Sequence, residues 1–335
     1  MPIDPDLAIG AELGEQAFSW TASDVLLYHL ALGAGGRPTD ERELRYAYER
    51  ELRVLPTFAT VAANAGHPPR QAGTVLSPES SREPSSQPSS QPSSQPPARS
   101  AAGPSGGRST AARPPGADGP PVSMPGVEID LAKVVHGTQA ITVHRPIPVD
   151  GSAVARTRIV DVLDKGTAAV IRNETVVTES DGRPLWTAQA SIFARGEGGF
   201  GGRRGSSERI EPPARAPDAV LDTPTLPQQA LLYRLCGDRN PLHADPGFAR
   251  SAGFDVPILH GLCTYGIVAK AVTDALLDAD VTRVASFSAR FSGTVLPGET
   301  LRTAVWGDGD RFLVEVRVPE RGDAPVLSDA VLTTT

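Results

Sequence analysis

The chain repeats one plan twice, and this repeat constrains its fold more than any other feature. The segment LLYHLALG (26–33) lines up with LLYRLCG (231–237), and HRPIPVDGSAVARTRIVDV (144–162) lines up with RFSGTVLPGETLRTAVWGD (290–308). In each copy a helix-like apolar segment is followed by long alternating segments rich in β-branched residues, which is the pattern of antiparallel strands. We therefore predict an α+β fold of two halves, in each of which a helix is wrapped by a curved antiparallel sheet.

The expected elements follow from the same periodicities. Helices are expected at 22–33, at about 225–235 and at about 262–277. Ser23 or Asp24 is expected to cap the first helix, because short polar side chains accept hydrogen bonds from the free N–H groups of a first turn. Strands are expected in the alternating parts of 122–195, 284–318 and 324–335.

Composition separates one segment from the rest. Residues 77–121 contain three tandem SSQP copies (85–96) and almost nothing apolar. Such a segment cannot bury enough surface to offset its ordering entropy, so we expect a disordered tether, with a Pro-rich peptide ligand as the alternative. The predicted organisation is an N-terminal half (1–76 with 122–200), this insertion (77–121), a linker (201–222) and a C-terminal half (223–335).

The net charge and the cysteines limit the classes of protein to which this chain can belong. The 335-residue chain has a net charge of −7, with 32 Lys and Arg against 39 Asp and Glu, which gives no electrostatic case for a nucleic-acid or membrane partner. No apolar run approaches the roughly 20 residues of a membrane span, and the acidic N-terminus does not resemble a signal peptide. Cys236 and Cys263 form neither a disulfide framework nor a metal motif. We expect a cytoplasmic protein with reduced thiols.

The most informative polar stretch is CGDRNPLH (236–243), which lies between two apolar segments. Gly237 tolerates positive φ, so it can end the preceding helix in an abrupt turn. Asp238 and Asn240 lie one residue apart, and His243 follows soon after. A carboxylate and an imidazole held close together can share one water and act as a general acid–base pair, while Asn240 would orient the water or a partner. A surface turn is the plain alternative.

A second feature is the pair His260-Gly261, at the start of an apolar segment that we predict to be a helix. The N–H of Gly261 would be a free donor at the positive end of that helix, suited to hold a carbonyl oxygen that gains negative charge. The N-terminal half has no counterpart of the polar residues in CGDRNPLH. One half is therefore expected to be catalytic, and the other to form a wall of the substrate site.

These residues carry a resemblance to a known family. The stretch YRLCGDRNPLHADPGFARSAGF resembles the signature of the MaoC-like, type 2 enoyl-CoA hydratases, which form (R)-3-hydroxyacyl-CoA. The similarity to the two-domain members extends through LPTFATV (55–61), IDLAKVVHGTQ (129–139), PILHGLCTYG (257–266) and ARFSGTVLPGETL (289–301), and covers nearly everything except 77–121.

The resemblance implies a double hot-dog fold and an (R)-specific hydro-lyase that acts on an acyl-CoA thioester without cofactor or metal. By analogy of fold, we expect a homodimer. It implies Asp238 and His243 as the catalytic pair, Asn240 as their assistant and the Gly261 N–H as the donor to the thioester oxygen. The positions that it implies for substrate contacts are His136, Gly137, Lys165, Arg239, Pro241, Leu242 and Phe291.

Other interpretations stay open at this stage. Acyl-CoA thioester hydrolysis and non-catalytic acyl-CoA binding are the rival functions. His243 and Asp238 could hold a metal ion, although the spacing of the other histidines gives no support for one. Lys165 could be a solvated residue of a hairpin turn, Phe291 could belong to the core, and His260 could either fix the helix start or act directly.

Overall fold

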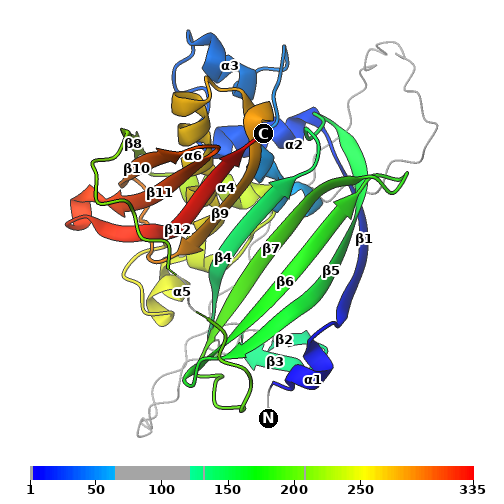
Figure 1. Ribbon diagram of the computed structural model, residues 1–335. Helices are drawn as coiled ribbons and strands as arrows, with labels where there is room; N and C mark the ends of the chain where they lie inside the picture. Colours follow the sequence, from blue (N-terminus) through cyan, green and yellow to red (C-terminus); the bar gives the residue numbers. More distant parts are fainter. Residues whose placement is uncertain (1–2, 65–120, 131–132, 207–208) are drawn as a thin grey trace, which may run out of the picture. The chain divides into compact units, whose positions relative to one another are not determined.

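Ten strands of the computed structural model join in one antiparallel sheet, whose strand order explains the sequence repeat (Figure 1). The structure describes residues 3–64, 121–130, 133–206 and 209–335. The predicted insertion, apart from Pro121, lies outside these residues. The strands are β1 (Glu12–Trp20), β2 (Pro121–Met124), β3 (Val127–Asp130), β4 (Val134–Val143), β5 (Gly151–Asp164), β6 (Ala168–Thr178), β7 (Pro184–Arg195), β8 (Ala219–Pro224), β9 (Val284–Phe291), β10 (Thr300–Asp308), β11 (Arg311–Val318) and β12 (Ala324–Thr334).

The two halves of the sheet have the same strand order. The N-terminal half runs β1-β5-β6-β7-β4 and the C-terminal half runs β8-β10-β11-β12-β9, so each strand has a counterpart. The halves join where β4 pairs with β9, with Thr138 opposite Arg290. The predicted α+β plan of two related halves is confirmed. Strand β8 forms at the end of the segment that we predicted to be a linker (201–222), because it pairs with β10 at the sheet edge.

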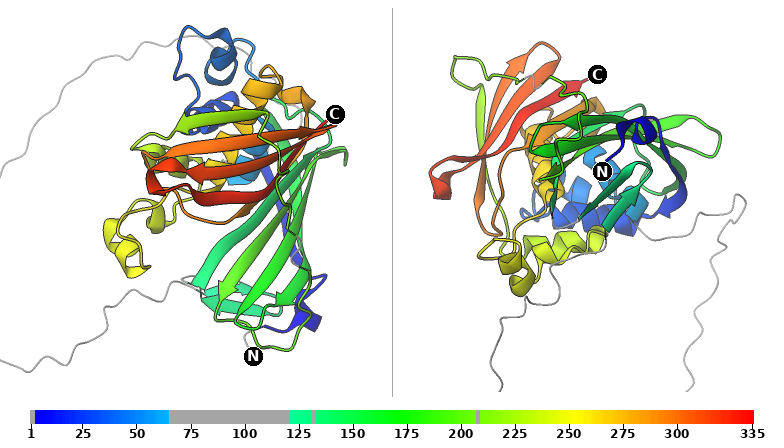
Figure 2. Two further views of the ribbon diagram at one scale, coloured as in Figure 1. Left: turned by 60° about the vertical axis from the view of Figure 1, so that its left-hand side comes forward. Right: turned by 90° about the horizontal axis from the view of Figure 1, so that it is seen from below.

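The longest helices gather beside the sheet where its two halves meet, whereas the first short helix lies at the far end of the N-terminal half (Figure 2). The α-helices are α1 (Pro5–Ala8), α2 (Ala22–Ala31), α3 (Glu41–Ala47), α4 (Gln229–Tyr233), α5 (Pro246–Ser251) and α6 (Gly261–Leu276), with short 3-10 turns that include η1 (Pro56–Thr60), η2 (Ala62–Asn64), η4 (Arg234–Cys236) and η5 (Pro241–His243). Helix α6 packs against η1, β8, β9 and β10. Its residues 263–270 are all buried, as expected for a helix that is apolar nearly all round.

The predicted N-terminal cap of helix α2 was wrong. Helix α2 begins after Thr21, and not at Ser23 or Asp24. Asp24 instead accepts hydrogen bonds from the main-chain N–H and the hydroxyl of Thr21, at 2.7 and 2.6 Å. The reciprocal capping box explains the difference, because a carboxylate three residues into a helix reaches back to the cap residue.

One hydrophobic core spans both halves. It includes Trp20, Tyr28 and Phe58 from the N-terminal half together with Tyr233 and Phe287 from the C-terminal half. The rings of Tyr28 and Tyr233 lie 6.2 Å apart between centroids, across the junction of the halves. Because the core is shared, the halves position each other's side chains.

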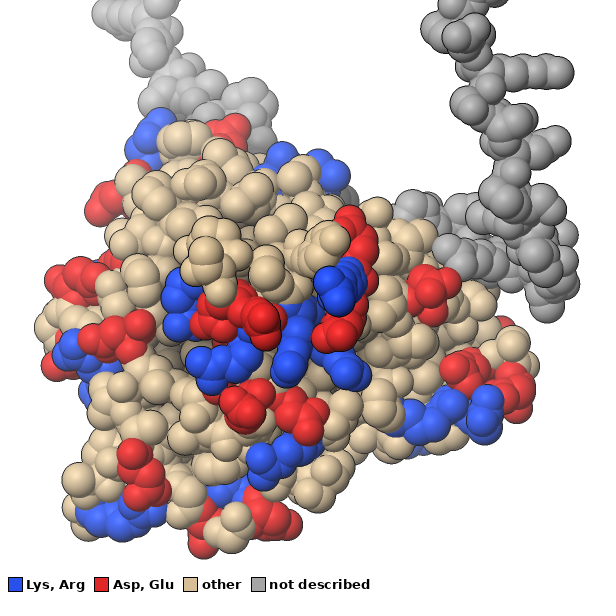
Figure 3. Space-filling view, turned by 90° about the horizontal axis from the view of Figure 1, so that it is seen from above, with Lys and Arg blue, Asp and Glu red and all other residues tan. Residues whose placement is uncertain are grey.

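The surface seen from above carries Lys and Arg side chains interspersed with Asp and Glu (Figure 3). Ion pairs around α3 follow this pattern, for example Arg37 with Asp40 at 3.4 Å and Arg42 with Asp278 at 3.3 Å. Such mixing leaves no single-sign field on this face. No described helix is both long and apolar enough to cross a bilayer.

Candidate active site

The loop that carries the polar motif begins at Gly237, as predicted. The turn η4 ends at Cys236, and Gly237 follows with φ of 118°, a conformation that side chains with a Cβ disfavour. A Cβ at Gly237 would also lie only 2.3 Å from the Cβ of Asn64. The chain therefore turns sharply here because residue 237 is glycine.

Two successive hydrogen bonds from main-chain N–H groups to side chains hold the loop. The N–H of Asn240 donates to Asp238 Oδ1 at 3.1 Å, and the N–H of Leu242 donates to Asn240 Oδ1 at 3.0 Å. Asn240 thus caps the turn η5, in which Pro241 occupies the first position. The structure gives Asn240 a role in loop geometry, and its contact with water or a partner stays a prediction.

His243 is held by a main-chain carbonyl. Its Nδ1 lies 2.8 Å from the carbonyl oxygen of Ile258, which can only accept, so Nδ1 carries the proton and Nε2 has the free lone pair. Burial lowers the pKa of His243 below its usual value, while the Ile258 carbonyl and the Asp238 carboxylate oppose this shift. His243 is therefore a neutral base near pH 7.

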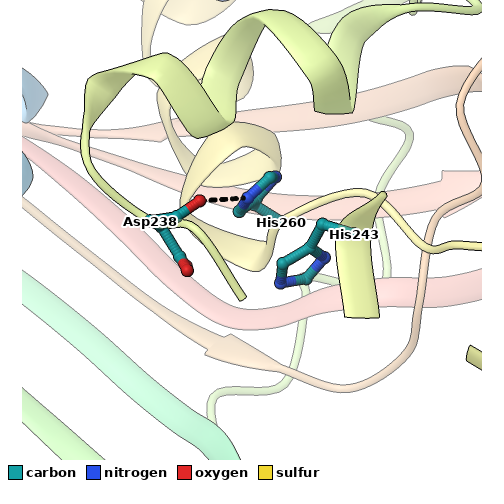
Figure 4. Close-up of side chains that lie close together, drawn as sticks. All are labelled: Asp238, His243 and His260. Carbon is teal, nitrogen blue, oxygen red and sulfur yellow. Dashed lines mark hydrogen bonds between the residues drawn. The ribbon is translucent and has the colours of Figure 1, made fainter. Parts of the chain in front are cut away.

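The Asp238 side chain and the His243 ring lie on the same side of the loop (Figure 4). A carboxylate oxygen of Asp238 and a ring nitrogen of His243 lie within 4.8 Å of each other. A water that makes hydrogen bonds of about 2.8 Å to two groups can join atoms up to roughly 5.6 Å apart. The two groups are close enough to share one water.

Phe291, near the start of α6, lies beside residues from both halves of the protein. Its ring lies 4.8 Å from the ring of His136, between centroids. A Cβ at Gly261 would lie 3.1 Å from the same Phe291 ring, so the absence of a side chain lets the ring approach the helix start. Burial lowers the pKa of His136, and the charge of Asp238 opposes this shift. One residue of each His-Gly pair, His136 and Gly261, thus lies beside the same aromatic ring.

Gly137 occupies a β-bulge. Opposite β7, His136 pairs with Ile192 and Thr138 pairs with Ser191, so Gly137 is the extra residue. A Cβ at Gly137 would lie 2.7 Å from Ser191 Oγ. The bulge changes the direction of the strand beside His136, and it needs a residue without a side chain.

The remaining predicted substrate contacts are more scattered. Lys165 lies in the turn between β5 and β6, where its Nζ donates to the Arg204 carbonyl at 2.6 Å. Strands β6 and β7 separate β5 from β4, so this turn is not adjacent to the strand that carries His136. Arg239 and Pro241 are exposed and Leu242 is half-buried. The loop residues border the acid–base pair, whereas Lys165 does not.

His260 is a member of this site whose role we left open at the sequence level. Its ring stacks on His243, with 3.7 Å between centroids and 27° between planes. In the sequence, the only sign of a role for His260 was its position directly before Gly261, and this position indicated no more than a helix start.

A metal ion is an alternative occupant of the same donors. One ligand atom each from Asp238, His243 and His260 lies within 4.8 Å of the others. Because the two imidazole rings are stacked with only 27° between their planes, their in-plane lone pairs do not meet at one ion at the wide angles of tetrahedral zinc ligands. A reaction without metal remains our prediction.

A groove of about 230 Å³ lies elsewhere, at the far end of β4. Residues of 52–56, 143–149 and 281–284 line it, and none of them belongs to the polar loop. It is therefore distinct from the candidate active site.

Substitution of Gly237 by Ala should lower the melting temperature more than the same change at Gly298. Both glycines have positive φ, at 118° and 97°, so each alanine would incur strain of about 1–2 kcal/mol. Only at position 237 would the new Cβ also collide, with Asn64, whereas nothing lies within 4 Å at position 298. Thermal unfolding followed by circular dichroism measures the difference, and equal shifts in the two variants would contradict the predicted packing.

Comparison with known proteins places this geometry in a family. The model of the MaoC like domain matches residues 209–323, and that of the MFE-2 hydratase 2 N-terminal domain matches residues 117–196. The enoyl-CoA hydratase ChsH3 of Mycobacterium tuberculosis is 48% identical over 332 residues, which cover 99% of each chain. The chain belongs to the MaoC-like family of two-domain type 2 enoyl-CoA hydratases. The peroxisomal enoyl-CoA hydratase 2 of Arabidopsis thaliana is 33% identical, over 94% of this chain and 91% of its own.

Solved structures of the family share the fold. The MaoC-like dehydratase from Phytophthora capsici superposes with a TM-score of 0.74 at 25% identity, over 99% of this chain and 98% of its own. The full-length peroxisomal multifunctional enzyme type 2 of Drosophila melanogaster gives a TM-score of 0.68 at 27% identity, over 96% of this chain and 48% of its own. The double hot-dog fold that the resemblance implied is confirmed.

Proposed function

We propose that this hydratase-family chain adds water reversibly to a trans-2-enoyl-CoA and forms the (R)-3-hydroxyacyl-CoA, in fatty-acid metabolism. The observation that carries the proposal is the placement of the Asp238 carboxylate and the neutral His243 ring within 4.8 Å, beside the first residue of α6. Relatives that match over nearly the whole chain are named enoyl-CoA hydratases, which supports the same reaction here.

The proposed roles follow from the chemistry of each group. Asp238 and His243 hold one water, whose oxygen forms a bond to C3 of the enoyl group. The proton that leaves this water passes to the acid–base pair, and the pair returns a proton to C2 on the same face, so the protein ends unchanged. The N–H of Gly261 has no acceptor within its helix and would hold the thioester oxygen as negative charge develops on it.

The N-terminal half is proposed to form a wall of the substrate site. His136, on β4 of that half, contacts Phe291 of the other half, and Phe291 borders Gly261. This packing supports substrate contacts by His136, Gly137 and Phe291. Arg239, Pro241 and Leu242 on the loop, and Lys165 on its hairpin, are proposed to contact the acyl-CoA as well.

The purified protein should hydrate trans-2-enoyl-CoA substrates across a series of acyl chain lengths. The measurement is the loss of enoyl absorbance, with chiral analysis of the product, and we expect the (R) isomer. Dialysis against EDTA should leave the rate unchanged, because no metal takes part. Release of free CoA, detected with a thiol reagent, would instead indicate a thioesterase. Ligand binding without loss of enoyl absorbance would indicate a non-catalytic subunit.

We also propose that the chain works as a homodimer in the cytoplasm. Both cysteines, Cys236 and Cys263, are free and buried, which supports a reducing compartment. Sedimentation analysis and fractionation of cells test the two parts of this proposal.

A further inference from the structure

His260 contacts or adjoins three groups of the candidate active site. It is the cap residue of α6, only 1% exposed, and Gly261 follows it directly. Its Nε2 lies 3.3 Å from the main-chain oxygen of Asp238 (Figure 4), and its ring stacks on His243. The His260 side chain therefore links Asp238, His243 and the start of α6.

The protonation of His260 follows from these contacts. Because the carbonyl oxygen of Asp238 can only accept, Nε2 carries the hydrogen and Nδ1 is bare. This Nδ1 is buried and has no hydrogen-bond partner among the described residues. Burial, together with a smaller effect of the neighbouring His243, lowers the pKa of His260 to about 4. His260 is therefore uncharged at neutral pH, where it has no proton to give at Nδ1.

An uncharged ring in this place can position the reacting groups without exchanging protons with them. The hydrogen bond from His260 Nε2 restrains the main chain of Asp238. The stacked His260 ring limits the tilt of the His243 ring. Displacement of a catalytic group by about 1 Å can lower a rate by roughly 100-fold. We propose that His260 is a positioning residue, which holds Asp238 and His243 at the spacing that a shared water requires and covers one face of His243 against solvent. This proposal rests on the proposed hydratase function for its kinetic part only.

Among the described residues, few charged or titratable groups surround the stacked pair. One of them is Tyr233, whose ring lies 4.9 Å from the His260 ring, between centroids. Asp238 acts on both histidines, and Arg234, on the turn before the loop, acts on His260. His136, on β4, feels the charge of Asp238 as well. None of these groups is removed by substitution of His260, so a change in the titration of His243 would report the loss of its covering ring.

Two substitutions separate the two contacts of His260. His260→Phe keeps a flat ring but removes the N–H donor, whereas His260→Gln keeps a donor but removes the ring. His260→Ala removes both. The matched control is His144→Gln, since His144 is exposed and bonds only to the Thr187 hydroxyl at 2.9 Å among its described side-chain partners.

We expect kcat for enoyl-CoA hydration to fall about 10-fold in each of the Phe and Gln variants and about 100-fold in His260→Ala, with KM changed less than about threefold. The pKa of His243, read by NMR titration of its ring, should rise toward the ordinary value in the Gln and Ala variants and stay low in His260→Phe. His144→Gln should match the wild type in both measurements.

The two readouts also separate failure of this proposal from failure of the proposed function. If the wild type hydrates enoyl-CoA but the folded His260 variants keep its kcat, His260 is not a positioning residue. The same conclusion follows if His260→Gln and His260→Ala lose kcat while His243 titrates in them as in the wild type. If the wild type shows no hydration and the titration still moves in His260→Gln but not in His260→Phe, the hydratase function fails and the positioning of His243 by His260 stands.

Discussion

Replacement of Asp238 by Asn should lower kcat for enoyl-CoA hydration by about 10³-fold, while the protein still folds. General acid–base groups typically contribute 10²–10⁴-fold, and an amide can neither take nor return the proton. Asn has the shape of Asp and keeps an oxygen that can accept the hydrogen bond from the Asn240 N–H, so the loop should be retained. The measurement is the initial rate of loss of enoyl absorbance at saturating substrate.

The control for this change is Asp255→Asn, on the exposed loop between α5 and α6. Near-ultraviolet circular dichroism and the melting temperature should be unchanged in both variants. A rate for folded Asp238→Asn within about tenfold of the wild type would remove Asp238 from the mechanism.

His243→Gln should lower kcat by a similar factor and change the pH dependence. In the wild type, burial lowers the pKa of His243 below its usual value of 6.5, so the neutral base is present above that lowered pKa. As the pH falls, kcat/KM should therefore decline with a midpoint below pH 6.5, as His243 takes up a proton. Gln does not titrate, so this decline should be lost or displaced in the variant.

The pH profile can also contradict the assignment. A wild-type decline centred above pH 6.5 would mean that His243 is not kept neutral by its surroundings. A decline with the same midpoint in His243→Gln as in the wild type would place the titrating base elsewhere. His144→Gln, which changes an exposed histidine, should leave the profile as it is in the wild type.

Much of the fold could be predicted because periodicity is a local property. The alternation of strands β5 and β6, with alanines buried and arginines exposed on the two faces of β5, is visible in the sequence. The repeat then predicted two related halves, and the structure gives both halves the same strand order. The cap of α2 was missed because Thr21 and Asp24 satisfy each other, a reciprocal arrangement that propensity alone does not distinguish from a cap at Ser23 or Asp24.

The sequence by itself determined the polar loop. Gly237, Asp238, Asn240 and His243 lie within seven residues, and local turn chemistry is enough to bring their side chains together. Only the tertiary structure decided what surrounds them. The Ile258 carbonyl that sets the tautomer of His243, the His260 ring stacked on it, and the contact of His136 with Phe291 join residues far apart in the chain. Such contacts depend on how β4 pairs with β9 and on how α6 packs against the sheet, because long-range packing, unlike turn chemistry, leaves no fixed spacing in the sequence.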